Sequence, residues 1–565
     1  MRHLRLAALA LTLAGACRPA PTYDVVIRGG TLYDGSGGAP VTGDVAIVGD
    51  SIVAVGPSLP GKGAREVDAT GLAVAPGFIN MLSWANEALL HDGRSQGDIR
   101  QGVTLEVFGE GWSMGPLTDT MRRISLAEQA DIRYDITWTT LGGYLDTLVA
   151  KGISTNVASF VGATTLRIHE VGWDDRAATP DELARMQQLV RDAMEEGALG
   201  VGSSLIYAPA FYASTAELVA LMQAAAPYGG MYISHMRSEG SRLLEAVDEL
   251  IAIARQSGAR AEIYHLKAGG QANWPKMAQV LAKVDSARAT GLAITANIYP
   301  YPAGATGLDA AMPPWVQAGG YAKWAERLRD PAIRARVKRE MGTPTDKWEN
   351  MFLAVGSPDR MLLVGFKAES LKQYTGKSLA EVARLRGTSP EETAMDLVIR
   401  DGSRVGTIYF MMDEANIRAE IAKPWVSVGS DAESMAPEGD FLKSNPHPRA
   451  YGTFARVLGK YVREERVISL EEAVRRLTSL PATNLRIARR GALRPGHFAD
   501  VVVFDPATII DHATFEAPHQ YATGVRDVFV NGVQVLSGGE HTGATPGRVV
   551  RGPGWKPHPQ TRSAP

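Results

Sequence analysis

The chain has 565 residues, which is too long for one ordinary hydrophobic core and favours a large domain with a smaller companion. Hydrophobic residues make up 45% and charged residues 21%, both ordinary for a soluble globular protein. The formal net charge of -2 gives no reason to expect nucleic acid or an anionic membrane surface as a partner.

The N-terminus predicts export. A basic leader, MRHLR, precedes an apolar run at 6–16 that is too short to span a bilayer but fits the central part of a secretory signal. The run ends in LAGAC at Cys17, which resembles a bacterial lipoprotein box. We therefore expect residues 1–17 to be a signal segment and the protein to be periplasmic or a membrane-anchored lipoprotein with a lipid on Cys17. An ordinary signal peptide cut nearby is the alternative. Because Cys17 is the only cysteine, the mature chain has no disulfides and no other thiolate metal ligands.

Short strands are predicted near both ends of the chain. Residues 23–74 alternate apolar and polar side chains between glycine turns, as in YDVVIRGGTLYDG and GDVAIVGDSIVAVG, which is typical of antiparallel strands. Residues 487–545 return to this pattern in GHFADVVVFDP and VRDVFVNGVQVLSGG. We expect the two segments to form one small β-domain, a β-sandwich built from both ends of the chain. The tail beyond Pro546 is rich in Pro, Arg and Gly, so we expect it to be poorly ordered.

Between these ends, residues 75–486 predict a barrel. Apolar runs of strand length recur and are separated by helical stretches. The eight runs are Val74–Ile79, Val103–Gly109, Asn156–Val161, Gly200–Leu205, Tyr232–His235, Ala261–His265, Ala293–Tyr299 and Trp425–Gly429. Eight such strands alternating with helices favour an α/β fold, a (β/α)8 TIM-type barrel. The stretch at about 302–400 is too long for one connection, so we expect an insertion over the barrel mouth.

Polar side chains follow four of the predicted strands. In a barrel of this kind the functional groups lie at the C-terminal ends of the strands. Glu110 follows the second strand, His235 ends the fifth, His265 ends the sixth and Asp431 follows the eighth. A lone histidine at a strand end is more often structural, but two on successive strands indicate a shared site. Two imidazoles and two carboxylates suit Zn²⁺, with one carboxylate left to handle protons.

Longer motifs resemble one known family. The N-terminal β-segment, VAPGFIN, GALRPGHFADVVVFDP and VFVNG resemble the amidohydrolase superfamily. RQGVTLEVFGEG, ISHMRSEG, YHLKAGG, NIYPYPAGATGL, NPHPRAYGTF and SLPATNLRI resemble its D-aminoacylase branch, the N-acyl-D-amino acid deacylases. The resemblance implies an enzyme that uses zinc to hydrolyse the linear amide bond of a small N-acyl-D-amino acid. It also implies that Glu110, His235 and His265 bind the metal and that Asp431 is the general base.

The chain departs from the family pattern at the first barrel strand. The superfamily ends this strand with His-x-His, whereas this chain reads PGFINMLSW, with Leu82 and Trp84 in place of the histidines. Neither side chain can bind a metal, so we expect one zinc ion per chain and an apolar wall at Trp84. A one-residue length difference after the second strand leaves the register of Glu110 open. Gly111 could occupy the aligned position instead, and Glu106 is a weaker substitute.

The resemblance also implies which residues surround the substrate. It places Lys267, Arg449 and Tyr207 around the substrate and Tyr299 where it can stabilise the tetrahedral oxyanion. Three alternatives remain: a hydrolase of the same fold acting on a peptide, lactam or other amide, an inactive exported binding homologue, and a carbohydrate-active barrel that uses Glu110 and Asp431 as facing carboxylates. The sequence does not indicate the oligomeric state.

Overall fold

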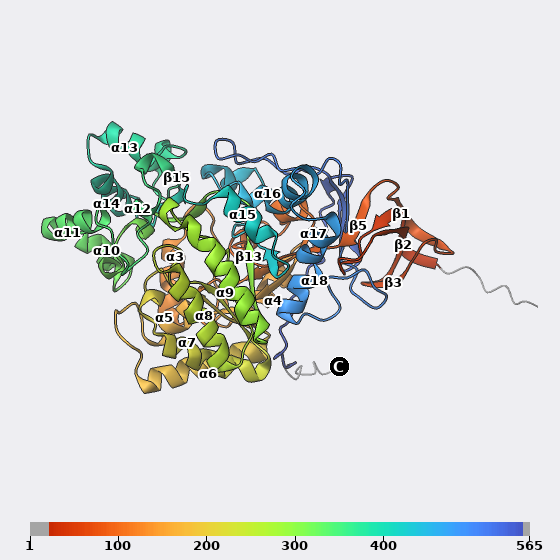
Figure 1. Ribbon diagram of the computed structural model, residues 1–565, viewed down its shortest axis with the longest axis horizontal. Coiled ribbons are helices and arrows are strands. Elements are labelled where there is room, and N and C mark those ends of the chain that lie inside the picture. The colour runs from red at the N-terminus through yellow and green to blue at the C-terminus, as the bar shows by residue number, and fades with distance from the viewer. Residues whose placement is uncertain (1–21, 558–565) are drawn as a thin grey trace, which may run out of the picture.

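The computed structural model describes residues 22–557, and the predicted signal segment with Cys17 lies outside them. Eight parallel strands form the central barrel (Figure 1). They are β6 (Phe78–Asn80), β7 (Val103–Phe108), β8 (Asn156–Ser159) continued by β9 (Val161–Gly162), β10 (Gly200–Ser204), β11 (Met231–His235), β12 (Ala261–Ile263), β13 (Ile294–Ile298) and β17 (Val426–Val428). The ring closes where the Asp431 N–H donates to the Leu82 carbonyl at 2.8 Å and Ser83 pairs with Ala432. The predicted (β/α)8 barrel is confirmed.

Helices cover the outside of the barrel. The main ones are α4 (Leu141–Lys151), α5 (Ala163–Glu170), α6 (Pro180–Glu196), α7 (Thr215–Ala225), α8 (Leu243–Ser257), α9 (Met277–Ala289), α15 (Glu414–Ile421), α16 (Arg449–Arg456), α17 (Leu470–Leu477) and α18 (Ser479–Leu485). Thr179 and Glu182 form a capping box at the start of α6, where Pro180 takes the first helical position. On α8, Leu243, Val247 and Leu250 repeat at helical spacing and are buried against the barrel strands. Two short helices, α1 (Ala88–His91) and α2 (Gln96–Ile99), fill the first strand-to-strand connection.

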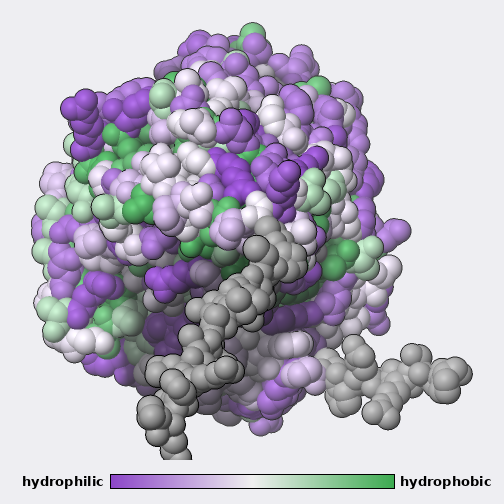
Figure 2. All heavy atoms as spheres, turned by 90° about the vertical axis from the view of Figure 1, so that its right-hand side faces the viewer, coloured by the Kyte–Doolittle hydropathy of each residue, from purple (hydrophilic) through white to green (hydrophobic). Residues whose placement is uncertain are grey.

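One nine-stranded sheet joins the two ends of the chain. Its order is β21-β20-β19-β18-β5-β1-β2-β3, with β4 paired to β1. The strands are β1 (Thr22–Leu32), β2 (Val41–Val48), β3 (Ser51–Gly56), β4 (Lys62–Asp68), β5 (Ala73–Pro76), β18 (Val501–Phe504), β19 (Val525–Val530), β20 (Val533–Ser537) and β21 (Glu540–His541). The sheet curls so that Val25 and Val45 share a core with Val503 and Phe529. The surface facing the viewer in Figure 2, on the side of β1–β3, is mainly hydrophilic with scattered hydrophobic residues.

The first predicted strand, Val74–Ile79, is divided between the two domains. β5 pairs with β18 in the small β-domain, whereas β6 begins the barrel beside β7. The chain changes sheets at Gly77, which packs so closely on Thr104 that an added Cβ would lie 2.1 Å from its hydroxyl oxygen. Only glycine fits this crossing point between the domains.

Residues 547–557 of the C-terminal tail pack against the barrel, contrary to the expectation of poor order beyond Pro546. The tail runs past the N-terminal ends of the barrel strands, where Val550 is buried. The Val157 N–H donates to the Arg548 carbonyl at 3.0 Å, and the Gly552 N–H donates to the Gly197 carbonyl at 2.8 Å. Amino-acid composition alone could not show that the backbone at the ends of the barrel strands would form hydrogen bonds with this segment.

The insertion forms a separate lobe at the end of the barrel opposite the small β-domain (Figure 1). It contains β14 (Gly304–Gly307), β15 (Met361–Gly365), β16 (Gly406–Tyr409), α10 (Tyr321–Arg327), α11 (Pro331–Met341), α12 (Met351–Ala354), α13 (Leu379–Arg386) and α14 (Pro390–Asp401). The three strands form an antiparallel sheet, so the insertion extends to β16, beyond the predicted end near 400. Among residues 22–557, no helix has the length and apolarity needed to cross a bilayer.

Candidate metal centre and active site

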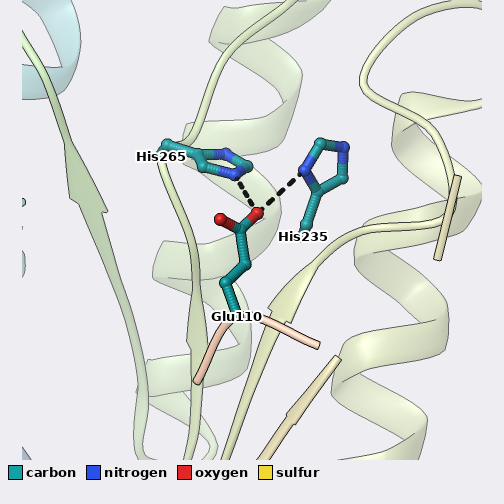
Figure 3. A group of neighbouring side chains, drawn as sticks. All are labelled: Glu110, His235 and His265. Carbon is teal, nitrogen blue, oxygen red and sulfur yellow. Dashed lines mark hydrogen bonds and ion pairs between the residues drawn. The ribbon is translucent and has the colours of Figure 1, made fainter. Parts of the chain in front are cut away.

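Three predicted ligands meet at one point of the barrel mouth. Glu110 follows β7, His235 ends β11 and His265 follows β12, and all three side chains are buried. Glu110 Oε1 lies 3.1 Å from His235 Nδ1 and 2.7 Å from His265 Nε2 (Figure 3). One possible ligand atom from each residue lies within 4.8 Å of the other two. The strand ends therefore bring two imidazole nitrogens to the same carboxylate oxygen.

The structure also shows which residue after β7 faces the two histidines. Gly111 has no side chain that could bind a metal. Its backbone has a positive φ of 70° and packs against Ser204, where the chain turns away from the site. Glu106 points elsewhere in the barrel and accepts hydrogen bonds from Ser83 and Thr155. Glu110 is therefore the residue after the second barrel strand that faces the two histidines.

Glu239 is a functional residue that the sequence reasoning missed. Its Oε1 lies 3.1 Å from His265 Nδ1 and accepts a 2.7 Å hydrogen bond from Lys267 Nζ, while its Oε2 lies 3.5 Å from His235 Nε2. Each imidazole thus presents one nitrogen to Glu110 and the other to Glu239. A carboxylate behind a metal-binding histidine fixes the ring and its tautomer. Its position four residues after His235, within ISHMRSEG, was the available signal.

Asp431 lies beside the three ligands and contacts Trp84 and Arg449. Arg449 Nη1 is 2.8 Å from Asp431 Oδ2. The Trp84 indole N–H donates both to Asp431 Oδ1 at 3.1 Å and to Glu110 Oε2 at 3.0 Å. The expectation of a purely apolar wall at Trp84 is therefore wrong, because its N–H links the two carboxylates. Leu82 is buried in the barrel core and takes no part.

The charges of the site follow from burial and from the neighbouring groups. Burial raises the pKa of Glu110, but the imidazoles of His265 and His235 lower it by a larger amount. The pKa of Glu110 therefore lies well below its usual range, and the carboxyl group is an anion. Burial and Lys267 lower the pKa of His265, but Glu110, Glu239 and Asp431 outweigh them and raise it to about 9. Burial raises the pKa of Asp431, and Arg449 offsets part of this increase.

Aromatic and cationic side chains complete a cavity of about 400 Å³ around the site. The Tyr299 ring is covered by Arg449, with 4.4 Å from the guanidinium carbon to the ring centre, and burial raises the pKa of Tyr299 to about 12. The ring centres of Tyr207 and His235 are 5.3 Å apart. Arg404 comes from the insertion, pairs with Asp309 at 2.9 Å and has a side chain that is 51% exposed. Arg404 was not among the predicted residues, because the expectation that the insertion covers the barrel mouth did not show which of its side chains reach the site.

His447 also lines the cavity, but its role is structural. Its Nε2 lies 3.0 Å from the Ala303 carbonyl oxygen, and its Nδ1 accepts a hydrogen bond from the Arg449 N–H at 3.0 Å. Burial lowers the pKa of His447 well below the usual range, so the ring is neutral. It holds the start of α16 and thereby positions Arg449.

The donor chemistry fits a divalent transition metal. Two imidazole nitrogens and one carboxylate oxygen are a common catalytic zinc set that leaves a position open for water or substrate. The carboxylate of Glu239 behind both rings is the outer support that such sites use. Glu110, His235 and His265 are the only group of three or more such side chains with this geometry between residues 22 and 557.

Comparisons with known proteins agree with this geometry. A family model described as the amidohydrolase family matches residues 65–536. The chain is 33% identical to a D-aminoacylase of Alcaligenes xylosoxydans xylosoxydans, over 94% of this chain and 97% of that protein. It is similar to the crystal structure of N-acyl-D-glutamate deacylase from Bordetella bronchiseptica complexed with zinc and a phosphonate inhibitor, a mimic of the tetrahedral intermediate (TM-score 0.77, 30% identity, 94% and 100% of the two chains). It also resembles a solved D-aminoacylase, described in terms of a binuclear metal centre with one-metal activation and second-metal attenuation (TM-score 0.77, 32% identity, 94% and 100% covered).

Proposed function

The chain belongs to the amidohydrolase family, and from that premise we propose that it hydrolyses N-acyl-D-amino acids with one zinc ion per chain. The observation that carries this proposal is the convergence of Glu110, His235 and His265 beside Asp431 in one cavity. The similar proteins include a D-aminoacylase and deacylases of N-acyl-D-aspartate and N-acyl-D-glutamate, each matched over at least 93% of this chain. The products would be a carboxylic acid and a free D-amino acid.

Each residue of the site would have a different role in the hydrolysis of the amide bond. Zinc held by Glu110, His235 and His265 would polarise the acyl carbonyl and make water a better nucleophile. Asp431 lies beside this point and would take the proton from water and deliver it to the leaving nitrogen. Tyr299 keeps its proton at neutral pH because its pKa is raised to about 12, so its hydroxyl can donate to the developing oxyanion.

A cationic wall would bind the substrate carboxylate. Lys267 and Arg449 line the cavity, although each already contacts a carboxylate of the protein, Glu239 and Asp431 respectively. Arg404 is more exposed and can turn toward a ligand, and Tyr207 packs under its guanidinium at 5.1 Å. We propose that these side chains together favour a substrate with a free carboxylate.

The test is a substrate screen on the zinc-loaded protein. N-acetyl-D-amino acids should be hydrolysed, whereas their L-enantiomers, lactams and the corresponding amino acid amides should be poor substrates. Equal activity on an N-acyl-D-amino acid and on the corresponding amino acid amide would contradict binding of the substrate carboxylate by the cationic wall. Turnover of a peptide or lactam, with no turnover of any N-acyl-D-amino acid, would replace the proposed function with another amide hydrolysis of the same fold.

We further propose that the protein is exported and carries a lipid on Cys17. The support is the basic leader, the short apolar run and the lone cysteine, all in the sequence. Cys17→Ser should abolish acylation and release the protein from membranes. Full-length protein in the cytoplasm with an intact N-terminus would contradict export.

A further inference from the structure

A second cavity adjoins the active site. It has a volume of about 460 Å³ and lies against α3 (Asp119–Glu128), a helix in the long connection that follows β7. Four side chains line both cavities, which therefore meet at this point. They are Trp84, Trp112, Arg404 and Glu433. Since Trp84 contacts Glu110 and Asp431 directly, the second cavity opens beside the reacting groups.

The wall of the second cavity contains a group of large apolar side chains among polar ones. Its lining includes Met121, Ile124, Ile136, Ile168 and Trp173. The rings of Trp112 and Trp173 are 5.5 Å apart, and Ile124 is 37% exposed. Large apolar side chains that remain accessible in a concave site are typical of a surface that binds an apolar ligand group.

Carboxyl groups line both cavities, and Arg404 and Glu433 lie where the cavities meet, but the cations that line one cavity alone belong to the active site. Lys267 and Arg449 line the active-site cavity, whereas Glu87 and Glu128 line the second. An N-acyl amino acid has one charged group, its carboxylate, and the cations that can pair with it lie in the active-site cavity and at the junction of the two cavities. The acyl group is uncharged, so the orientation that pairs the carboxylate with Lys267 or Arg449 leaves the second cavity to the acyl group.

We propose that the second cavity is an acyl-chain site and that the preferred substrates carry a medium or long alkyl acyl group. This assignment rests on the proposed deacylase function, because it places the scissile amide at the metal ligands, with Trp84 on the side of the acyl group. The alkyl chain would extend past Trp112 along α3 and be removed from water there. The amino acid portion would remain against the cationic wall.

A chain-length series tests the assignment. The zinc-loaded protein is assayed with N-acetyl, N-hexanoyl and N-decanoyl derivatives of one D-amino acid. The kcat/KM value should increase by about fourfold for each methylene that becomes buried, until the cavity is filled. An N-acetyl derivative that is as good a substrate as the N-decanoyl one would overturn the proposal. So would preference for an N-(6-aminohexanoyl) group over the hexanoyl group, because the glutamates would then select a cation.

Two residues on the same helix provide a matched pair of variants. Ile124 lines the cavity, whereas Leu126 is 39% exposed and is not part of its lining. Ile124→Glu should lower the ratio of kcat/KM for the decanoyl and acetyl substrates at least tenfold, because it places a carboxylate beside the chain. Leu126→Glu should leave both values unchanged. Equal effects of the two variants on the ratio would overturn the proposal.

Binding of the product acid separates failure of this site from failure of the proposed function. Decanoate should bind to the zinc-loaded protein at least a hundredfold more tightly than acetate in calorimetry, and Ile124→Glu should remove most of the difference. If no N-acyl-D-amino acid is hydrolysed but this difference is found, the proposed function fails while the apolar site stands. Equal affinities for decanoate and acetate would overturn the site itself.

Discussion

Trp84 shows how one substitution changes the design of the site. In the superfamily pattern this position carries the second histidine of His-x-His, but here an indole N–H is shared between Glu110 Oε2 and Asp431 Oδ1. Two buried carboxylates near one another repel and need a positive or donating group between them. The indole supplies a donor without a charge, and its ring reaches toward the second cavity. Trp84 therefore both holds the catalytic carboxylates and limits the space on the acyl side.

Trp84→Phe tests this role, because it keeps an aromatic ring and removes the N–H. A hydrogen bond to a charged group contributes about 1.5–3 kcal/mol, so kcat should fall by about 10- to 100-fold. Zinc content should remain unchanged, since Glu110, His235 and His265 are retained. Turnover measured alongside metal analysis checks both points. An unchanged kcat would show that the N–H does not position the carboxylates.

Arg449 should control the protonation of Asp431. The Asp431 carboxyl has a pKa above its ordinary value because it is buried, and the Arg449 cation 2.8 Å away keeps that pKa from rising further. A general base must be deprotonated, so activity is lost as the pH falls through its pKa. Arg449→Met removes the cation, raises the pKa of Asp431 and should move the acidic limb of the kcat/KM profile to higher pH. A higher KM with an unmoved limb would mean that Arg449 only binds the substrate.

At the level of elements, periodicity and strand ends allowed most of the barrel to be predicted. The apolar runs located the barrel strands, and the rule that functional groups follow strands selected Glu110, His235, His265 and Asp431, which the structure brings together in one cavity. Sequence could not show the contact from Glu239 to both histidines, because that contact depends on how a loop folds back after β11. The sheet change at Gly77 was missed for a similar reason, since a continuous apolar run hides a crossing between two sheets.

The packing of the C-terminal tail could not be predicted from its composition either. Its contacts predict that deleting the tail lowers the stability of the protein. Deleting residues 546–565 removes the buried side chain of Val550 and backbone hydrogen bonds to Ile153, Val157 and Gly197. Each such bond contributes about 1 kcal/mol and the valine about 2 kcal/mol, so Tm should fall by about 5 °C in calorimetry. The reference is the chain without residues 558–565, which keeps every described contact of the tail, and the larger deletion should lower Tm relative to it. Equal Tm values for both truncations would contradict a structural role for the tail.

At the level of the whole molecule, each domain constrains one end of the barrel. The small β-domain joins the N-terminal strands to the C-terminal strands where β5 pairs with β18. The insertion contributes Arg404, Thr306 and Met411 to the active-site cavity. The joining of the two chain ends could be predicted from their matching alternation. The position of the insertion over the barrel mouth could also be predicted, but not which of its side chains line the site, because that depends on packing that its own sequence does not reveal.

The number of metal ions is the property of the whole molecule that follows most directly from the missing His-x-His. Leu82 is buried and the Trp84 N–H lies between Glu110 and Asp431, and in the part of the chain that the structure describes Glu110, His235 and His265 are the only group of three possible ligands. Three protein ligands and a water complete a tetrahedral catalytic zinc site. Metal analysis should therefore give one zinc ion per chain, even after incubation with excess zinc.

Variants around the site should separate metal binding from turnover. His235→Ala and His265→Ala should lose both the zinc and the activity. Glu239→Gln should weaken zinc affinity by about 10- to 100-fold, because it removes the support behind both rings. Asp431→Asn should keep the zinc but lose turnover, since it removes the proton carrier and no ligand. Two zinc ions per chain, or full activity after exhaustive chelation, would show that Trp84 does not exclude a second ion or that the reaction needs none.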